Sequence, residues 1–239
     1  MEIFLFLTIH WFVSLFSQTF FHHRYAAHRM FAMSKFWEKT FFILTFIAQG
    51  ASYLKPSAYA IMHRQHHAHS DTAEDPHSPH FTGNVMKMMF RTGVIYHHLV
   101  KDTEQEPKPP EWESFDRFAD SMYMRLLWGT LYTCFYFYYM TNFWVLLLLP
   151  VHYLMGPIHG AIVNWCGHKY GYRNFDNGDH SRNTLLVDLL LMGELYQNNH
   201  HKNPNRANFG YRWFEFDPAY PIVKLLHSLR IIRLNPISA

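Results

Sequence analysis

Long apolar stretches alternate with polar segments along this chain, and the apolar stretches predict membrane helices. Residues 3–21 are almost wholly apolar, close to the ~20 residues that an α-helix needs to cross a bilayer. Glu2 precedes this run and His22-His23-Arg24 follows it, which is unlike a cleavable secretory signal. We therefore expect a retained membrane helix over about residues 1–21. Its C-terminal end, with Arg24 and Arg29, would be cytoplasmic under the positive-inside rule.

A second apolar run, residues 41–54, is too short to cross a bilayer comfortably and contains Gln49-Gly50. Runs of that length are more often re-entrant or interfacial segments, or buried core helices. A full crossing would also place His23 and His63 on opposite sides of the membrane, where they could not share one site. We expect this run to enter the membrane and return.

Two longer apolar stretches, residues 122–140 and 143–166, are joined at Thr141-Asn142 and predict a hairpin of two crossings. Pro150 and Pro157 would kink the second crossing, which neighbouring helices can tolerate. Residues 55–121 and 167–239 then both lie on the cytoplasmic side, and a Pro- and Glu-rich stretch at 104–110 indicates a surface loop.

These patterns together predict one domain over residues 1–239. Its fold class is an all-α integral membrane protein with about three transmembrane helices and a re-entrant helix, carrying a helical cytoplasmic cap. Residues 221–234 are amphipathic, with apolar positions alternating with Lys224, His227, Arg230 and Arg233. This pattern fits an interfacial helix on anionic lipid, and it fits a packed C-terminal helix of the cap equally well.

The composition agrees with a membrane protein and excludes other classes. Charged residues make up 16% of the chain, against ~25% in ordinary soluble domains. The mean hydropathy of −0.18 averages polar His- and Asn-rich segments with long apolar ones. The net charge of +3 comes without a Lys/Arg run, so no nucleic acid partner is expected. The two cysteines lie in apolar stretches, so no disulfide framework is expected.

Histidine is the chemically informative residue of this chain. Its nineteen histidines outnumber the eighteen carboxylates, and eight of them fall in four short clusters beside apolar stretches. The clusters are HRYAAH (residues 23–28), HRQHH (63–67), NWCGH (164–168) and QNNHH (197–201). Neutral imidazole is the commonest metal ligand in proteins. This donor set suits iron or zinc better than an oxygen-binding cation such as magnesium.

The spacing within the clusters supports convergence on metal. His63, His66 and His67 follow an i, i+3, i+4 pattern that places side chains on one helical face. Gln197, His200 and His201 repeat this pattern, and Asn164 precedes His168 by four residues. His23 and His28 are five apart, roughly 140° around an α-helix, so they could converge only at a fraying helix end. Eight imidazoles exceed the needs of one ion and imply two.

The other histidines are expected to be ordinary core or interfacial residues. This reading is preferred for seven isolated positions: His10, His97, His98, His152, His159, His180 and His227. For His22 and His69 the two readings are evenly balanced.

The three boxes HRYAAH, HRQHH and QNNHH resemble the histidine boxes of the integral-membrane fatty acid desaturases. Three further features are similar to the stearoyl-CoA desaturase branch: DTAEDPHSP at residues 71–79, the Asn-x3-His pair in NWCGH, and Gly193-Glu194 before the third box. The resemblance extends from about residue 16 to residue 218.

This resemblance implies an oxygen-dependent di-iron acyl desaturase, with the irons above a bent apolar tunnel. It implies two ligand sets, His23, His28, His63, His67 and His200 for one iron, and His66, His168 and His201 for the other, with Asn164 acting through a water. Asp75 and Glu194 would accept hydrogen bonds from ring N–H groups. General metal-site chemistry leads to the same role for such carboxylates.

The chain departs from that branch in two ways. Gln197 stands where the branch has a histidine, so the second iron would have five ligands or be bound less tightly, with Gln197 as a weaker candidate ligand. The front-end desaturases also have Gln there, so the change does not exclude activity, but it leaves open which bond is oxidised. Only one membrane helix precedes the first box, where the branch has two. Either the subfamily is shorter or the true start lies upstream.

The implied reaction introduces a cis double bond into a fatty acyl chain. Its carrier could be CoA, a carrier protein or an intact lipid, and the resemblance favours CoA. Removing two hydrogens from an unactivated methylene pair is beyond acid–base chemistry, so the cofactor carries the difficult step. O2 is the expected co-substrate, and a separate ferredoxin or cytochrome b5 is the expected electron donor. Trp11 and Leu15, one helical turn apart below the first box, are candidates for the closed end of the tunnel.

Two other functions remain open from the sequence. A hydroxylase of lipids or alkanes could use the same kind of cluster and would differ in whether oxygen is added to carbon. A non-enzymatic membrane protein could hold structural zinc or haem, although structural zinc usually takes four ligands in a closed site. An inactive relative is a further alternative because of Gln197.

Overall fold

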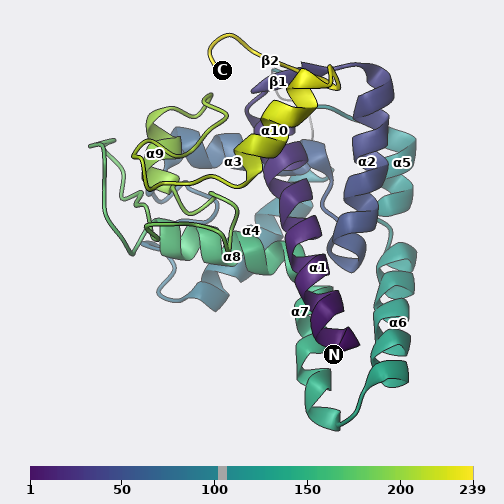
Figure 1. The fold of residues 1–239 in the computed structure, drawn as a ribbon. Helices are drawn as coiled ribbons and strands as arrows, with labels where there is room; N and C mark the ends of the chain where they lie inside the picture. The colour runs from purple at the N-terminus through teal and green to yellow at the C-terminus, as the bar shows by residue number, and fades with distance from the viewer. Residues whose placement is uncertain (102–106, 239) are drawn as a thin grey trace.

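The computed structural model describes residues 1–101 and 107–238 and is mostly helical (Figure 1). The helices of the N-terminal half are α1 (Glu2–Ser17), a π-helix (Gln18–Ala27), α2 (Lys35–Gln49), a 3-10 turn (Gly50–Ser52), α3 (Pro56–His69) and α4 (Val85–Leu99). Those that follow are α5 (Glu113–Ala119), α6 (Met122–Tyr139), a 3-10 helix (Phe143–Leu148), α7 (Leu149–Tyr153), α8 (Met155–Gly167), α9 (Gln197–Lys202) and α10 (Ala219–Ser228). Residues 104–106 of the expected Pro/Glu loop lie outside the described residues, and residues 107–110 are irregular.

The first predicted helix is present and longer than expected, because α1 continues directly into the π-helix. Together they form a helix over Glu2–Ala27, the one helix among the described residues that is by itself long and apolar enough to cross a membrane. The π winding carries i to i+5 hydrogen bonds, among them the His28 N–H to the His23 carbonyl at 3.1 Å. Residues five apart therefore share a face, so His23 and His28 converge without the frayed end that we expected.

The second apolar run forms most of α2, which runs beside α1 and then turns back (Figure 1). The turn is made by Gly50 at φ +52°, and a Cβ there would collide with the Tyr132 hydroxyl at 1.7 Å. Only glycine combines that backbone conformation with that close approach. The chain returns through α3, and His63 then lies beside His28, with 2.8 Å between the two Nε2 atoms.

The last two apolar stretches differ from each other. Residues 122–140 form the single helix α6, as predicted. Residues 143–166 do not form one continuous helix, because the segment before Leu154 and α8 are bent by 74°. Pro150 and Pro157 do not kink a continuous helix but lie in the first turns of α7 and α8, where a missing N–H costs little. Counted as one span, this bent pair brings the candidate spans of the described residues to two.

The C-terminal helix is shorter than predicted. α10 ends at Ser228, and Ile232–Leu234 forms strand β2, antiparallel to β1 (Phe31–Met33) with Ala32 opposite Arg233. The helix end is closed by hydrogen bonds from the Arg230 and Ile231 N–H groups, with Arg230 in the left-handed region at φ 59°. This geometry is a common helix stop. The described residues are thus mostly helical, consistent with the expected all-α class, and carry in addition one small two-stranded sheet that was not predicted.

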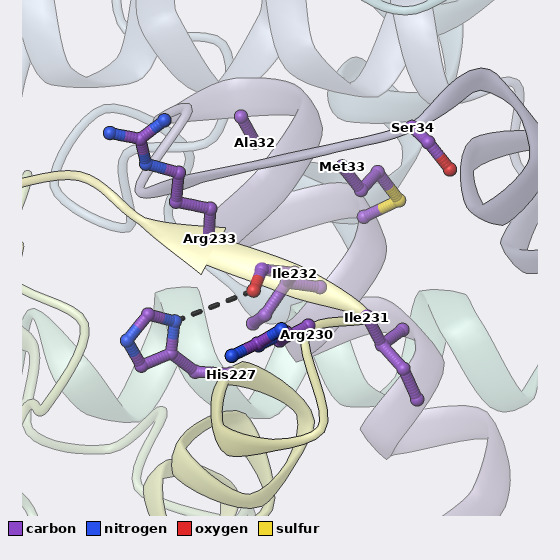
Figure 2. Close-up of a pocket in the computed structure, with 8 residues that line it drawn as sticks. All are labelled: Ala32, Met33, Ser34, His227, Arg230, Ile231, Ile232 and Arg233. Carbon is purple, nitrogen blue, oxygen red and sulfur yellow. Dashed lines mark hydrogen bonds between the residues drawn. The ribbon is translucent and has the colours of Figure 1, made fainter.

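A cavity of about 400 Å³ lies at this sheet, between the strands and the end of α10 (Figure 2). Figure 2 shows His227 with its Nδ1 3.4 Å from the Ile232 carbonyl oxygen, and the Arg230 and Arg233 side chains among the lining residues. No histidine of the four clusters lines this cavity. The four histidine clusters therefore lie elsewhere in the fold.

The largest core cluster joins the π-helix to the C-terminal segment, and a buried cation lies at its edge. Arg24 is 0% exposed, donates to Asp217 at 2.7 Å and to Glu194 at 3.2 Å, and lies 3.9 Å from the centroid of the Phe209 ring. Arg24 is therefore a buried partner of two carboxylates, and the cytoplasmic side predicted for this helix end stays a prediction. Of the two arginines used in that prediction, only Arg29 is exposed.

We predict that Arg24→Met lowers the thermal unfolding temperature of the detergent-solubilised protein strongly. The substitution leaves two carboxylates buried without their cation, which typically costs about 3–5 kcal/mol. Arg117→Met is the matched control, because Arg117 pairs with Glu113 on the surface and exposed pairs contribute little. Equal melting temperatures for the two variants would contradict the prediction.

Candidate metal centre

The four histidine clusters meet at one place although they come from different elements. The π-helix supplies His23 and ends next to His28, α3 supplies three rings, His168 follows α8, and α9 supplies two. Two groups of possible metal ligands result, and within each the ligand atoms lie within 4.8 Å of one another. The five-histidine set is His23, His28, His63, His67 and His200, and the three-histidine set is His66, His168 and His201.

In the five-histidine set the Nε2 atoms face a common point. The Nε2 atom of His200 lies 2.9 Å from that of His23 and 3.0 Å from that of His67. The Nε2 atom of His63 lies 2.8 Å from that of His28 and 3.0 Å from that of His67. Nitrogen lone pairs gathered this closely from separate elements form a donor set suited to one cation.

The three-histidine set is adjacent. His66 and His201 approach to 3.3 Å between Nε2 atoms, and the His168 ring centroid lies 4.9 Å from each of theirs. His168 Nε2 is buried and has no hydrogen-bond partner. The two sets touch because His67 and His201 are 4.5 Å apart between ring centroids. The arrangement can therefore hold two neighbouring ions.

Carboxylates accept from the far side of these rings. Asp75 lies 3.0 Å from His66 Nδ1, and Glu194 lies 2.7 Å from His23 Nδ1. These are the two carboxylates that the sequence suggested. A hydrogen bond at Nδ1 fixes the ring orientation and leaves Nε2 free to bind metal.

Two further carboxylates that contact the rings were not selected as candidates from the sequence. Asp71 lies 2.8 Å from His168 Nδ1, and Asp179 lies 2.7 Å from His201 Nδ1. Each ring of the three-histidine set thus has its own aspartate. Asp71 belongs to the acidic segment after the second box, which could have drawn attention to it. Asp179 lies in an irregular loop without periodicity, and no sequence signal pointed to it.

Burial sets the protonation of the site. It lowers the pKa values of the rings that α3 and α9 supply, so these rings are neutral at pH 7: His63, His66, His67, His200 and His201. Burial raises the pKa of Asp75 to about 6. Burial, the largest single cause, acts to raise the pKa values of Asp71 and Asp179, but hydrogen bonds to and attraction by His168 and His201, together with nearby N–H donors, lower both. Neutral imidazoles beside carboxylates are the protonation state that metal binding requires.

Gln197 is buried at the edge of the site. Its amide nitrogen donates to the Glu194 carbonyl at 3.0 Å, while its Oε1 atom is buried without a partner. A Cβ on Gly167 would lie 2.4 Å from Gln197 Cγ, so glycine at position 167 makes room for this side chain. Asn164 is partly buried on α8, one turn before His168.

His77 is a further residue that the sequence reasoning did not select. It is buried, its ring centroid lies 4.3 Å from that of His66, and neither of its nitrogens has a partner. It forms a third possible ligand group with His66 and Asp75. Since His66 and Asp75 already serve the three-histidine set, His77 lines that set rather than defining a separate centre.

The histidines that were expected to be ordinary residues lie outside these groups among the described residues. His22 approaches the Leu54 carbonyl at 2.8 Å, and His69 pairs with Glu74 at the surface. Trp11 donates its indole N–H to the Leu190 carbonyl at 3.0 Å, and its ring meets His159 edge-on. Leu15 is buried in a cluster with Leu191, Met192, Leu195 and Ala219.

The fold and the site together place the chain in one class of protein: helical proteins with a long apolar helix and two adjacent sets of histidines that can hold metal. Within that class, the chain belongs to the fatty acid desaturase family, whose model matches residues 3–226. The family assignment that the histidine boxes suggested is confirmed. The chain is therefore an oxidoreductase of the desaturase type, in a family that is membrane-associated.

Individual relatives agree on the reaction and differ in the acyl carrier. The sn-1 stearoyl-lipid 9-desaturase of Anabaena variabilis is 30% identical over 93% of this chain and 79% of its own length. The acyl-CoA 5-desaturase of Anemone leveillei is 27% identical over 93% of this chain and 68% of its own. The sn-2 palmitoyl-lipid 9-desaturase of a Nostoc strain is 24% identical, with 94% and 78% covered.

We predict that Asp179→Asn weakens metal binding at the three-histidine set by roughly 10–100-fold, the usual effect of losing such an outer partner. The variant keeps the side-chain size but removes the charge next to His201. Metal content per chain after competition with a graded chelator measures the effect. Asp176→Asn is the control, since Asp176 is 94% exposed in the same loop. Equal metal retention by the two variants would count against the role of Asp179.

Proposed function

We propose that this chain is a single-domain, di-iron desaturase that uses O2 to introduce a cis double bond into a fatty acyl chain. The observation that carries the proposal is the pair of adjacent imidazole sets, one of five rings and one of three. Family membership supplies the reaction class. We further propose a multi-pass membrane protein with its metal centre on the cytoplasmic face.

The donor chemistry fits iron. Imidazole nitrogens suit iron and zinc, but a closed zinc site takes about four ligands, whereas eight rings gather here in two touching groups. His23, His28, His63, His67 and His200 would hold one iron. His66, His168 and His201 would hold the other, with Asn164 acting through a water and Gln197 as an additional candidate ligand. When bound, the iron pair would supply oxygen activation and hydrogen removal, with two electrons from an external ferredoxin or cytochrome b5.

Carboxylates of this chain orient the rings and would compensate for the lower number of ligands in the three-histidine set. The three-histidine set has three aspartates behind its rings, while Glu194 is the carboxylate bonded to the five-histidine set. A carboxylate makes an imidazole more basic and a stronger ligand. Three such partners therefore offset the lower number of rings and the glutamine at position 197.

The substrate is a fatty acyl chain, carried by CoA or by a lipid, as the relatives that act on each carrier suggest. Burial of the rings excludes water from the reacting carbon. Trp11 and Leu15 would close the far end of the acyl tunnel. Trp11 fits this role because its indole is held by the Leu190 carbonyl and stacks edge-on against His159, so its ring is fixed as a stop.

Expression in a host that lacks its own desaturase tests the proposal directly. Mass spectrometry should locate a new double bond in the host's fatty acids, and the purified protein should hold close to two irons per chain. His66→Ala should abolish the product. His69→Ala is the matched control on the same helix, because His69 lies outside both sets and pairs with Glu74 at the surface, and it should retain the product.

Other outcomes of this experiment would point to other functions. An alcohol as main product would replace the desaturase with a hydroxylase. One zinc per chain without oxygen consumption would indicate a structural metal site. Iron binding without any product in the presence of a reducing partner would indicate an inactive relative.

We predict that Trp11→Ala shifts the chain-length preference toward longer acyl chains, because removing the indole lengthens the tunnel. The readout is the product distribution from a mixture of saturated acyl chains of graded length. Trp213→Ala serves as the control, since Trp213 is 96% exposed. An unchanged chain length and double-bond position in Trp11→Ala would remove Trp11 from the tunnel end.

A further inference from the structure

The irregular segment 185–192, between α8 and α9, presents an unusual surface. Four of its side chains are exposed and apolar: Leu186 (65%), Val187 (48%), Leu189 (57%) and Leu190 (52%). The segment has the sequence LLVDLLLM, so its one charged residue is Asp188. That carboxylate is 0% exposed. The segment therefore has its apolar groups outside and its charge inside, the reverse of an ordinary surface loop.

The buried carboxylate holds the backbone of the segment. Asp188 accepts the Leu191 N–H and the Leu195 N–H, both at 2.9 Å. Its own carbonyl accepts the Gly193 N–H at 3.2 Å, and the Leu191 carbonyl accepts the Glu194 N–H at 3.1 Å. These bonds replace the solvent contacts that an irregular backbone would otherwise make.

Two aromatic side chains complete this pattern. The Tyr196 hydroxyl accepts the Asp188 N–H at 3.0 Å and lies 3.2 Å from the Leu186 carbonyl, to which it donates. Trp11 donates to the Leu190 carbonyl at 3.0 Å. Irregular backbone at membrane depth is tolerated only where protein satisfies its polar groups. Within the segment, these contacts satisfy the N–H groups of Asp188 and Leu191 and the carbonyls of Leu186, Asp188, Leu190 and Leu191.

The Trp11 contact also fixes the depth of the segment. Trp11 lies near the middle of Glu2–Ala27, the helix that is long and apolar enough to cross a membrane. The neighbouring Phe12 and Val13 of α1 are exposed to 39% and 48%. On its inner side the segment packs Leu191 and Met192 against Leu15. The exposed leucines thus continue the apolar outer surface of the candidate membrane helix.

We propose that residues 185–192 form a membrane-inserted loop whose Leu186, Val187, Leu189 and Leu190 side chains contact lipid acyl chains, with Asp188 as its internal anchor. The partner is the hydrocarbon of the bilayer, since the exposed surface carries no charge to attract headgroups. This surface goes beyond desaturation and does not depend on the proposed chemistry. The two proposals can fail separately: the protein could desaturate acyl chains while this loop lies in water, or the loop could insert into lipid in a protein that has no activity.

Site-directed spin labelling of the full chain in phosphatidylcholine nanodiscs tests the loop. Leu189→Cys and, separately, Leu186→Cys carry a nitroxide in a background where Cys134→Ser and Cys166→Ser remove the native thiols. Collision with O2, which concentrates in hydrocarbon, is compared with collision with a water-soluble nickel chelate. Phe12→Cys is the lipid-facing reference and Asp176→Cys the aqueous one. Thermal unfolding checks that each labelled protein is folded.

We expect labels at positions 186 and 189 to match position 12, with O2 collisions exceeding nickel collisions several-fold. Nickel accessibility like that of position 176 would show a loop in water and overturn the proposal. Protection from both reagents would show that another protein or a second copy of this chain covers the loop, which would overturn it as well.

Discussion

The rest of the structure depends on the hydrogen bonds and the ion pair that the buried Glu194 carboxylate makes. One oxygen binds His23 Nδ1 at 2.7 Å, and the other accepts from Arg24 and from Thr19. Arg24 in turn reaches Asp217 at 2.7 Å. Because a buried charge is tolerated only when it is paired, these contacts lock the end of the first helix to the segments before α9 and α10. The candidate metal centre and the core therefore share the same carboxylate.

Helical spacing explains how so few elements supply two metal sets. On α3, His63 and His67 are one turn apart and face the five-histidine set, while His66 between them faces the three-histidine set. On α9, His200 and His201 divide in the same way. Adjacent residues on a helix point about 100° apart, so one short helix can serve two neighbouring ions. In the same way, the π-helix brings His23 and His28, which are five residues apart, to one face.

Among the described residues, two of the four non-glycine residues with positive φ adjoin the candidate metal centre, and the other two, Arg29 and Arg230, precede the strands of the small sheet. Asp71, at φ 58°, carries the carboxylate that faces His168, and Met192, at φ 52°, immediately precedes Gly193-Glu194. Left-handed conformations cost side-chain-bearing residues on the order of 1 kcal/mol or more and persist where the surroundings hold them. Here the surroundings are the carboxylate–imidazole contacts and the hydrogen bonds of the 185–192 segment.

The sequence by itself determined which eight histidines are candidate metal ligands, in which four clusters they lie, and to which family the chain belongs. It also pointed to two of the four carboxylates that contact the rings, Asp75 and Glu194. Each of these predictions rests on local spacing or on a contiguous motif. The tertiary structure alone decided the partnership of Asp71 with His168 and of Asp179 with His201, the burial of Arg24, the break at Leu154, and the pairing of β1 with β2. Asp71 and His168 are 97 residues apart. Loop residues follow no periodic sequence pattern from which such a contact could be predicted. Periodicity reports which face of one element is apolar, whereas the meeting of two loops, or of two chain ends, is set by how the packed helices bring them together.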